Sequence, residues 1–142
     1  MDAMAVKQQI EGLITRQNNI LESLGKFRKQ YAEARISYET QQTAMTTLHR
    51  EKTMKLALDP SISEATDPRS GRANKEWSQY LIDAELESDQ DYIKQFARVW
   101  DAQQDMFNAE ADQLILAEEL GVTKVQSRML SSLLDYASGE LP

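Results

Sequence analysis

The most regular pattern in the chain is a stripe of largely apolar residues between Val6 and Lys52. Its positions are separated alternately by four and three residues, and the alternation never slips. This spacing places the side chains on one narrow face of an α-helix, as in the seam of a coiled coil. We therefore predict one long helix over about residues 3–58, beginning at Asp2. The stripe consists of Val6, Ile10, Leu13, Gln17, Ile20, Leu24, Phe27, Tyr31, Ala34, Tyr38, Gln41, Met45, Leu48 and Lys52.

Gly25 is the weak point of this helix, because glycine in a helix interior costs about 1 kcal/mol relative to alanine. Burial of each large residue of the stripe contributes roughly 1.5–3 kcal/mol. We therefore expect the helix to continue through Gly25, whereas a break there would produce two shorter helices. Asp59-Pro60 ends the helix, since the residue before a proline is disfavoured in the α conformation. The pattern is then lost, which predicts a loop over about residues 59–73.

A second helical arm is predicted over about residues 74–120, with Asn74 as its N-cap. Ser88 followed three residues later by Asp91 indicates a break near residue 88. The apolar residues of this arm repeat with a period near 3.6 and form a broad face. That face comprises Trp77, Leu81, Ala84, Tyr92, Phe96, Val99, Trp100, Gln103, Met106, Phe107, Ala111, Leu114 and Ala117.

Gly121 predicts the end of the second arm, since glycine commonly follows a helix C-terminus. Thr123 and Gln126 then predict the start of a short C-terminal helix over about residues 123–138. Two arms of equal length joined by one loop indicate an antiparallel hairpin. The predicted fold is therefore all-α, a long, coiled-coil-like antiparallel helical hairpin with a short C-terminal helix, in one domain over residues 1–142.

The hairpin is expected to assemble as an oligomeric bundle, because two arms cover only part of two wide apolar faces. The bulky Tyr31 and Tyr38 in the first arm also favour packing against several helices. The residues predicted to form the core and the self-association surface are Ile10, Leu13, Ile20, Leu24, Phe27, Tyr31, Tyr38, Met45, Leu48, Trp77, Phe96, Trp100 and Phe107.

Composition narrows the class of protein. The chain has 142 residues, 41% of them hydrophobic, and no cysteine, so disulfides and thiolate metal sites are excluded. No apolar run approaches the roughly 18 residues of a membrane span, and the first four residues lack the features of a signal peptide. We expect a cytoplasmic protein that does not enter a membrane.

Charge is distributed unevenly around the net value of −7. Residues 1–58 carry +3, whereas residues 59–142 carry −10. Pairing between the two halves, within the chain or between subunits, explains this division. The alternative is an acidic inhibitor that occupies a basic, nucleic-acid-binding surface on another protein. The carboxylates of that alternative are Asp83, Glu85, Glu87, Asp89 and Asp91.

The chain offers little material for catalysis. Its one histidine, His49, has no Glu-x-x-His or His-Glu-x-x-His pattern around it, and its five glycines are too far apart to form a phosphate-binding loop. We predict no catalytic residue, no metal site, no cofactor and no enzymatic activity.

Residues 116–124 resemble the turn of a helix-turn-helix DNA-binding unit, with Ala117 and Gly121 at the expected spacing. The resemblance covers about 20 residues and would make Lys124 and Arg128 contacts to DNA. Ser127 departs from it, since the motif has a buried Val or Ile at that position. The acidic surroundings also fit a phosphate backbone poorly. The simpler interpretation is a glycine-capped helix corner.

The segment from Asp67 to Trp77, followed by Asp89-Gln90-Asp91-Tyr92, resembles parts of short all-helical proteins encoded in bacteriophage recombination cassettes. The resemblance covers about 25 residues and contains no diagnostic motif. It implies an accessory protein of phage DNA metabolism in the cytoplasm of a bacterial host, with no catalytic residue to carry over.

The leading functional prediction is a non-enzymatic helical interaction or scaffold protein that forms a homo-oligomer and contacts a protein partner. The acidic inhibitor and the DNA-binding regulator are the alternatives, and the net charge does not favour nucleic acid. The candidate residues for partner binding are Arg69, Arg72, Lys75, Lys124 and Arg128.

Overall fold

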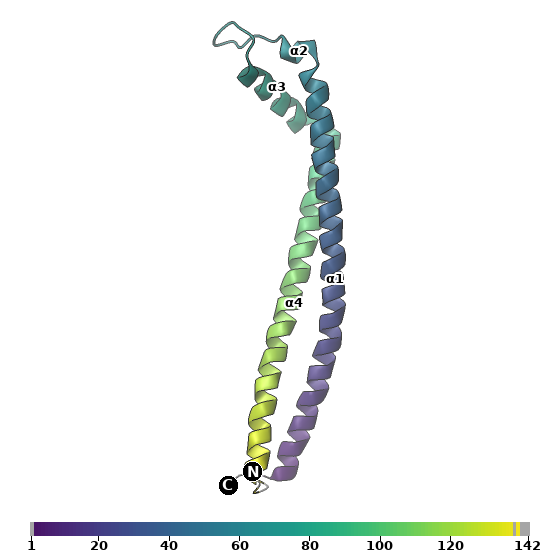
Figure 1. Cartoon of the computed structure of the whole chain (residues 1–142), viewed down its shortest axis with the longest axis vertical. Helices are drawn as coiled ribbons and strands as arrows, with labels where there is room; N and C mark the ends of the chain where they lie inside the picture. Colours follow the sequence, from purple (N-terminus) through teal and green to yellow (C-terminus); the bar gives the residue numbers. More distant parts are fainter. Residues whose placement is uncertain (1, 138, 140–142) are drawn as a thin grey trace. The chain divides into compact units, whose positions relative to one another are not determined.

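The computed structural model describes residues 2–137 and 139, and this part of the chain contains α-helices and no β-strand (Figure 1). The helices are α1 (Ala3–Ala57), α2 (Pro60–Ser63), α3 (Lys75–Ser88) and α4 (Gln90–Ala137).

The chain divides into two compact units, and the long helices α1 and α4 contribute to both. Unit 1 comprises Met1–Glu33 and Met106–Pro142, and unit 2 comprises Ala34–Asp105. Each unit is described separately below.

Helix α1 is continuous, as the apolar stripe predicts. The Asp2 carboxylate accepts a hydrogen bond from the backbone N–H of Met4 at 3.1 Å and caps the start of the helix. Gly25 lies within the helix without a break. Every position of the stripe from Val6 to Lys52 is buried or half-buried, so the stripe is the face that α1 packs against its neighbours.

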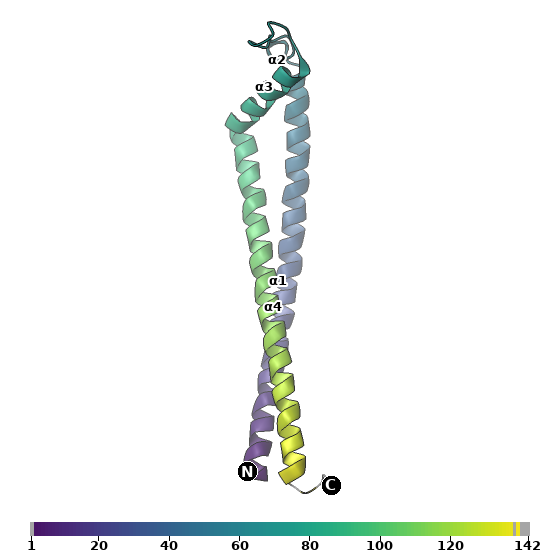
Figure 2. The ribbon, with the colours of Figure 1, turned by 90° about the vertical axis from the view of Figure 1, so that its left-hand side faces the viewer.

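In unit 1 the first part of α1 lies antiparallel to the last part of α4, as Figures 1 and 2 show. Ile20 and Leu24 of α1 form a core cluster with Leu120 of α4, and Leu116 packs against it. Arg16 forms an ion pair with Glu119 at 2.7 Å. These contacts join the two helices along their apolar stripes.

Unit 2 repeats the antiparallel pairing between the later part of α1 and the start of α4. The Gln95 side chain donates a hydrogen bond to the backbone carbonyl of Gln41 at 2.9 Å, and Lys52 Nζ contacts Asp89 Oδ2 at 2.7 Å. Residue numbers fall along α4 as they rise along α1, so the helices are antiparallel. The all-α helical hairpin is therefore confirmed.

The core of unit 2 includes a second cluster beside this pairing. It brings α2 and α3 together through Ile62, Ile82 and Leu86. Helix α2 lies within the segment predicted to be a loop. It forms because Asp59 caps it through the N–H of Ser61 and Pro60 occupies the first helical position, where no N–H is needed.

The break predicted near residue 88 is confirmed, although its capping residue differs. Asp89 has an extended backbone, and its carboxylate accepts a hydrogen bond from the N–H of Tyr92 at 3.0 Å, which caps α4. Ser88 instead donates to carbonyl groups at the end of α3. Asn74 caps α3 through the N–H of Trp77, as predicted.

The prediction of a separate C-terminal helix is wrong, because α4 continues through Gly121 to Ala137. The left-handed backbone of a glycine cap occurs at Gly139, not at Gly121. Leu120 and Thr123, on either side of Gly121, are both buried. Their burial outweighs the cost of about 1 kcal/mol for one helical glycine. Residue 138, the predicted end, lies outside the described residues.

The broad apolar face predicted for the second arm is covered only in part. Phe96, Trp100 and Phe107 are exposed, at 59, 55 and 47%, so they do not belong to the core of the single chain. Their predicted place on the self-association surface stays a prediction. Two paired helices cover a narrow stripe with a 3.5-residue period. In α4 the buried and half-buried positions at this spacing are Tyr92, Gln95, Val99, Ala102, Met106, Ala109, Gln113, Leu116, Leu120, Thr123, Ser127, Leu130 and Leu134.

Small residues in the covered stripe of α4 explain how two helices accommodate the large tyrosines of α1. In unit 2 the register of the Lys52–Asp89 and His49–Tyr92 contacts brings the buried Ala102 near the level of the half-buried Tyr38. In unit 1 the register of the cluster of Ile20 and Leu24 with Leu120 and Leu116 brings the buried Ala109 near the level of the half-buried Tyr31. Large side chains beside small ones fill an interface without requiring a third helix.

None of the described helices combines the length and the apolar character that crossing a membrane would require.

Candidate functional site

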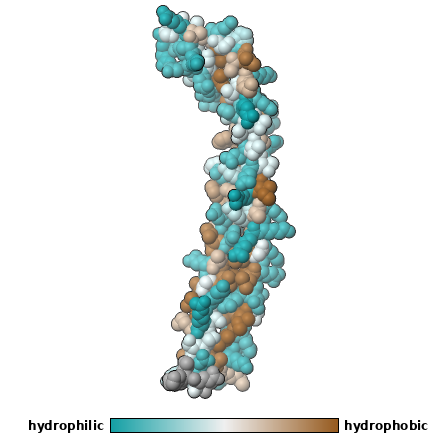
Figure 3. Space-filling view, in the orientation of Figure 1, coloured by the Kyte–Doolittle hydropathy of each residue, from teal (hydrophilic) through white to brown (hydrophobic). Residues whose placement is uncertain are grey.

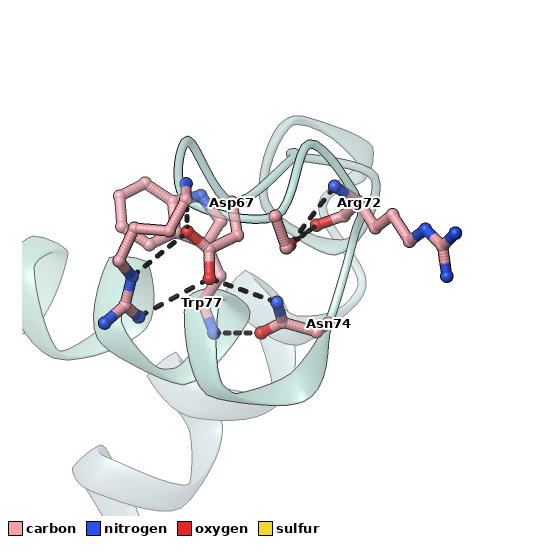
Figure 4. Close-up of polar contacts among 6 residues, drawn as sticks. Asp67, Arg72, Asn74 and Trp77 are labelled. Atoms are coloured by element: carbon pink, nitrogen blue, oxygen red, sulfur yellow. Dashed lines mark hydrogen bonds and ion pairs between the residues drawn. The ribbon is translucent and has the colours of Figure 1, made fainter.

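The segment between α2 and α3 is a structured loop built around Asp67, whose residue is only 5% exposed (Figure 4). One carboxylate oxygen accepts the backbone N–H of Arg69 at 2.9 Å, and the other accepts the Asn74 side-chain amide at 3.2 Å. Asn74 in turn accepts the N–H of Trp77 at 2.8 Å. Asp67 thereby ties the loop to the first turn of α3.

Backbone hydrogen bonds close the same loop. The N–H of Asp67 donates to the carbonyl of Arg72 at 2.9 Å, and the N–H of Gly71 donates to the carbonyl of Asp67 at 2.7 Å. Gly71 has a φ of +69°, a conformation in which a side chain is strained. The loop therefore has a defined shape rather than being a plain connection.

The loop contains a carboxylate whose pKa is lowered. The backbone N–H of Arg69 is the main cause of the low pKa of Asp67, followed by the Asn74 amide. Both stabilise the charged form. The Arg69 guanidinium also lies 3.4 Å from the carboxylate. The Asp67 carboxylate therefore partly balances the positive charge of Arg69 within the loop.

Arg72 on this loop and Lys75 at the start of α3 are the cations that could contact a partner. Both are exposed, and no ion pair to either occurs among the described residues. In Figure 4 the Arg72 side chain points away from the loop. Close in sequence, the rings of Trp77 and Tyr80 stack with their centroids 5.1 Å apart. Arg69, Arg72 and Lys75 thus lie on this loop and at the start of α3, with the Arg69 side chain at Asp67 and the Arg72 side chain turned away from the loop.

Lys52 meets the acidic start of α4 in unit 2. Its ammonium lies 2.7 Å from Asp89 and 3.9 Å from Asp91. The hydrogen bond between Lys52 and Asp89 is the main cause of the raised pKa of Lys52 and the lowered pKa of Asp89. Asp83 accepts a hydrogen bond from Gln79 at 2.8 Å. Asp83, Asp89 and Asp91 therefore already contact side chains of this chain. An acidic inhibitor would have fewer unbonded carboxylates to offer a basic target than the sequence suggests.

His49 lies at the surface of the same unit. Its Nδ1 is 3.2 Å from the Tyr92 hydroxyl. Among residues 2–137 and 139, no three His, Asp or Glu side chains gather in a way that could hold a metal ion.

Lys124 and Arg128 lie on α4 in unit 1, where the sequence predicts a glycine-capped helix corner and offers a helix-turn-helix as the alternative. The corner does not form, because α4 is continuous there. The two cations instead line a shallow polar groove with Gln17, Ser127, Ser131 and Ser132. They are neighbours on one helix face, but no recognition helix is separated from a preceding helix by a turn.

Large apolar side chains are exposed on each unit, as the sequence predicts from the width of its apolar faces, but most of these residues were not among the predicted self-association residues. Figure 3 shows hydrophobic areas over unit 1, separated by polar residues. In unit 1 the exposed residues are Met4, Ile14, Leu21, Phe107, Leu114, Ile115, Val122, Val125, Met129, Leu133 and Tyr136. In unit 2 they are Ile36, Met54, Leu58, Tyr80, Ile93, Phe96 and Trp100. The signal available in the sequence was the width of the apolar face of α4, which exceeds what one partner helix covers.

A comparison of the chain with protein-family models, with curated proteins and with solved structures finds no significant match. The resemblance to phage recombination-cassette proteins therefore stays a prediction.

Proposed function

We propose that this protein is a non-enzymatic helical interaction protein that assembles with copies of itself through the apolar faces of α1 and α4. The observation that carries the proposal is the imbalance between buried and exposed apolar residues within each unit. In unit 1 the buried hydrophobic residues are Val6, Ile20, Leu24, Ala109 and Leu120. More large apolar side chains of that unit are exposed than are buried.

Energetics support the same proposal. Folded monomers rarely expose contiguous apolar patches larger than a few hundred Å². Aromatic side chains such as Phe96 and Trp100 contribute most when a partner buries them. Packing two hairpins together would cover these faces in a four-helix arrangement, which is a common solution for antiparallel helices.

Sedimentation equilibrium of the full chain tests the proposal. We expect a mass above 16.2 kDa that depends on concentration, and a melting temperature that rises with protein concentration, because association stabilises the folded state by mass action. Circular dichroism at 222 nm over a hundredfold concentration range measures the second effect. A monomeric mass at every concentration, with a melting temperature that does not change, would overturn the proposal.

A further inference from the structure

Unit 1 contains an open apolar groove between α1 and α4. It has a volume of about 550 Å³ and is lined by Gln9, Gly12, Leu13, Arg16, Gln126, Met129 and Leu130. Leu13 and Leu130 belong to the covered stripes, so the groove reaches the seam between the two helices. The one ion pair beside it, Arg16–Glu119, is satisfied within the chain. An apolar occupant would therefore meet no unpaired charge from Arg16.

The same unit carries an apolar ridge of the kind that fits such a groove. Val122, Val125 and Met129 follow one another at i, i+3 and i+7 on α4 and are 53, 53 and 67% exposed. This is the spacing with which an amphipathic helix inserts into a hydrophobic groove. A second apolar hollow runs along the ridge and is lined by Glu118, Gly121, Val122, Val125 and Gln126.

The exposed area of the chain is large enough for a stable interface. The protein exposes 10360 Å², whereas a folded monomer of 16.2 kDa exposes about 7500 Å². The excess, roughly 2900 Å², includes polar and apolar surface of both units and exceeds the ~800 Å² per partner of a standard interface. The groove and the ridge are apolar parts of that surface in unit 1.

We infer that unit 1 is the self-association surface, with the α4 ridge of a second copy seated in the groove of the first. The inference rests on the proposed function and names the surface that would perform it. A groove and a ridge on one unit allow an isologous dimer, in which each copy supplies the ridge for the other. The interface would contain apolar side chains from both long helices and the internal Arg16–Glu119 pair at its edge.

Substitution of two glycines on this surface, Gly12 and Gly121, tests the inference. Gly12 lines the groove and Gly121 lines the hollow. Apart from the neighbouring residues and the backbone of the same helical turn, a Cβ built on either would meet no atom of the chain within 4 Å, and neither has a positive φ. Nothing inside the chain requires a glycine at these helical positions. A closely approaching partner helix would require one, because a methyl group would then occupy its space.

Gly25 is the matched control. It also lies in α1, within unit 1, and its Cβ would likewise meet nothing within 4 Å. It lines neither the groove nor the hollow. Gly12→Ala, Gly121→Ala and Gly25→Ala therefore have the same effect on the isolated chain, and only the first two add a methyl group to the proposed interface.

The experiment measures the self-dissociation constant of the full chain for each variant by sedimentation equilibrium. We expect Gly12→Ala and Gly121→Ala to raise the dissociation constant about tenfold or more, as overpacking of a close interface does. Gly25→Ala should leave it within about twofold. Met129→Glu, which places a charge on the ridge, should weaken association at least as strongly while the helix content of the chain is retained.

Each outcome separates this inference from the proposed function. Assembly of the wild type with an unchanged dissociation constant in both groove variants would overturn the assigned surface and leave self-association standing. Equal weakening by Gly12→Ala and Gly25→Ala would overturn it as well, since the effect would then not come from the groove. A monomeric wild type would overturn both.

Discussion

Gly25 and Gly71 should respond to the same substitution with opposite signs. Gly25 lies inside α1, has no positive φ, and has open space where a Cβ would be. Gly71 also has open space, but its φ is +69°. Alanine therefore meets no steric obstacle at either site, and the backbone conformation alone decides the effect.

The magnitudes follow from that conformation. In an α-helix, alanine is favoured over glycine by up to about 1 kcal/mol, so Gly25→Ala should stabilise the chain by about 0.5–1 kcal/mol. For a chain of 142 residues this corresponds to a rise of about 2–4 °C in melting temperature. At Gly71, the left-handed conformation costs alanine roughly 1–2 kcal/mol, so Gly71→Ala should lower stability by about 1 kcal/mol after the smaller entropy of its unfolded chain is counted.

Urea and thermal unfolding followed by circular dichroism at 222 nm, at one protein concentration, measures both changes. A loss of stability in Gly25→Ala would refute the continuous α1, because only a bend or a left-handed residue at that position would disfavour alanine. A gain in Gly71→Ala would show that the loop does not hold the positive φ.

Further predictions concern the core and two carboxylates. Leu24→Ala, at a position 2% exposed, should lower the free energy of unfolding by about 2–5 kcal/mol in urea titrations; a change below 1 kcal/mol would mean that the cluster with Leu120 does not form. The pKa of Asp67 is lowered, so the stability that its carboxylate contributes is present above the unfolded pKa near 4 and is lost as pH falls through the folded pKa. Asp67→Asn should therefore lose less stability in acid than the wild type does. An acid unfolding transition identical to that of the wild type would contradict the hydrogen bonds in the loop. The pKa of Lys52 is raised, so the stability that it contributes is present below about pH 10 and is lost as pH rises through the folded pKa. Lys52→Gln should remove this loss of stability at alkaline pH. A dependence of stability on pH identical to that of the wild type would argue against the pairing of Lys52 with Asp89.

The sequence predicted the helices well where no local signal for a helix end opposed a strong hydrophobic periodicity. The uninterrupted four–three spacing specified α1, and a single glycine could not overcome so many buried side chains. Asn74 and the break near residue 88 were recognisable because capping depends on a few neighbouring residues. The failure at Gly121 has the same origin: a local cap signal was opposed by the burial of Leu120 and Thr123, which depends on α1 and is not visible locally.

The candidate site was harder to predict. The cations of the loop were apparent as residue types, but Asp67, which organises them, was not selected. Its role depends on hydrogen bonds to Arg69 and Asn74 that arise only when the loop closes. The sequence placed Phe96 and Trp100 in one set of core and self-association residues and could not separate the two roles, because a periodic apolar face does not show which of its residues the partner helix covers.

The sequence by itself determined the helical class and the seam of α1, since helix periodicity and proline or capping signals act over a few residues. The tertiary structure decided which side of α4 is covered. Its covered stripe includes the small Ala102 and Ala109, near the level of Tyr38 and Tyr31, whereas Phe96, Trp100 and Phe107 of the same helix lie on the surface. That choice depends on the fit between segments far apart in the chain, and it creates the apolar surface to which we assign self-association.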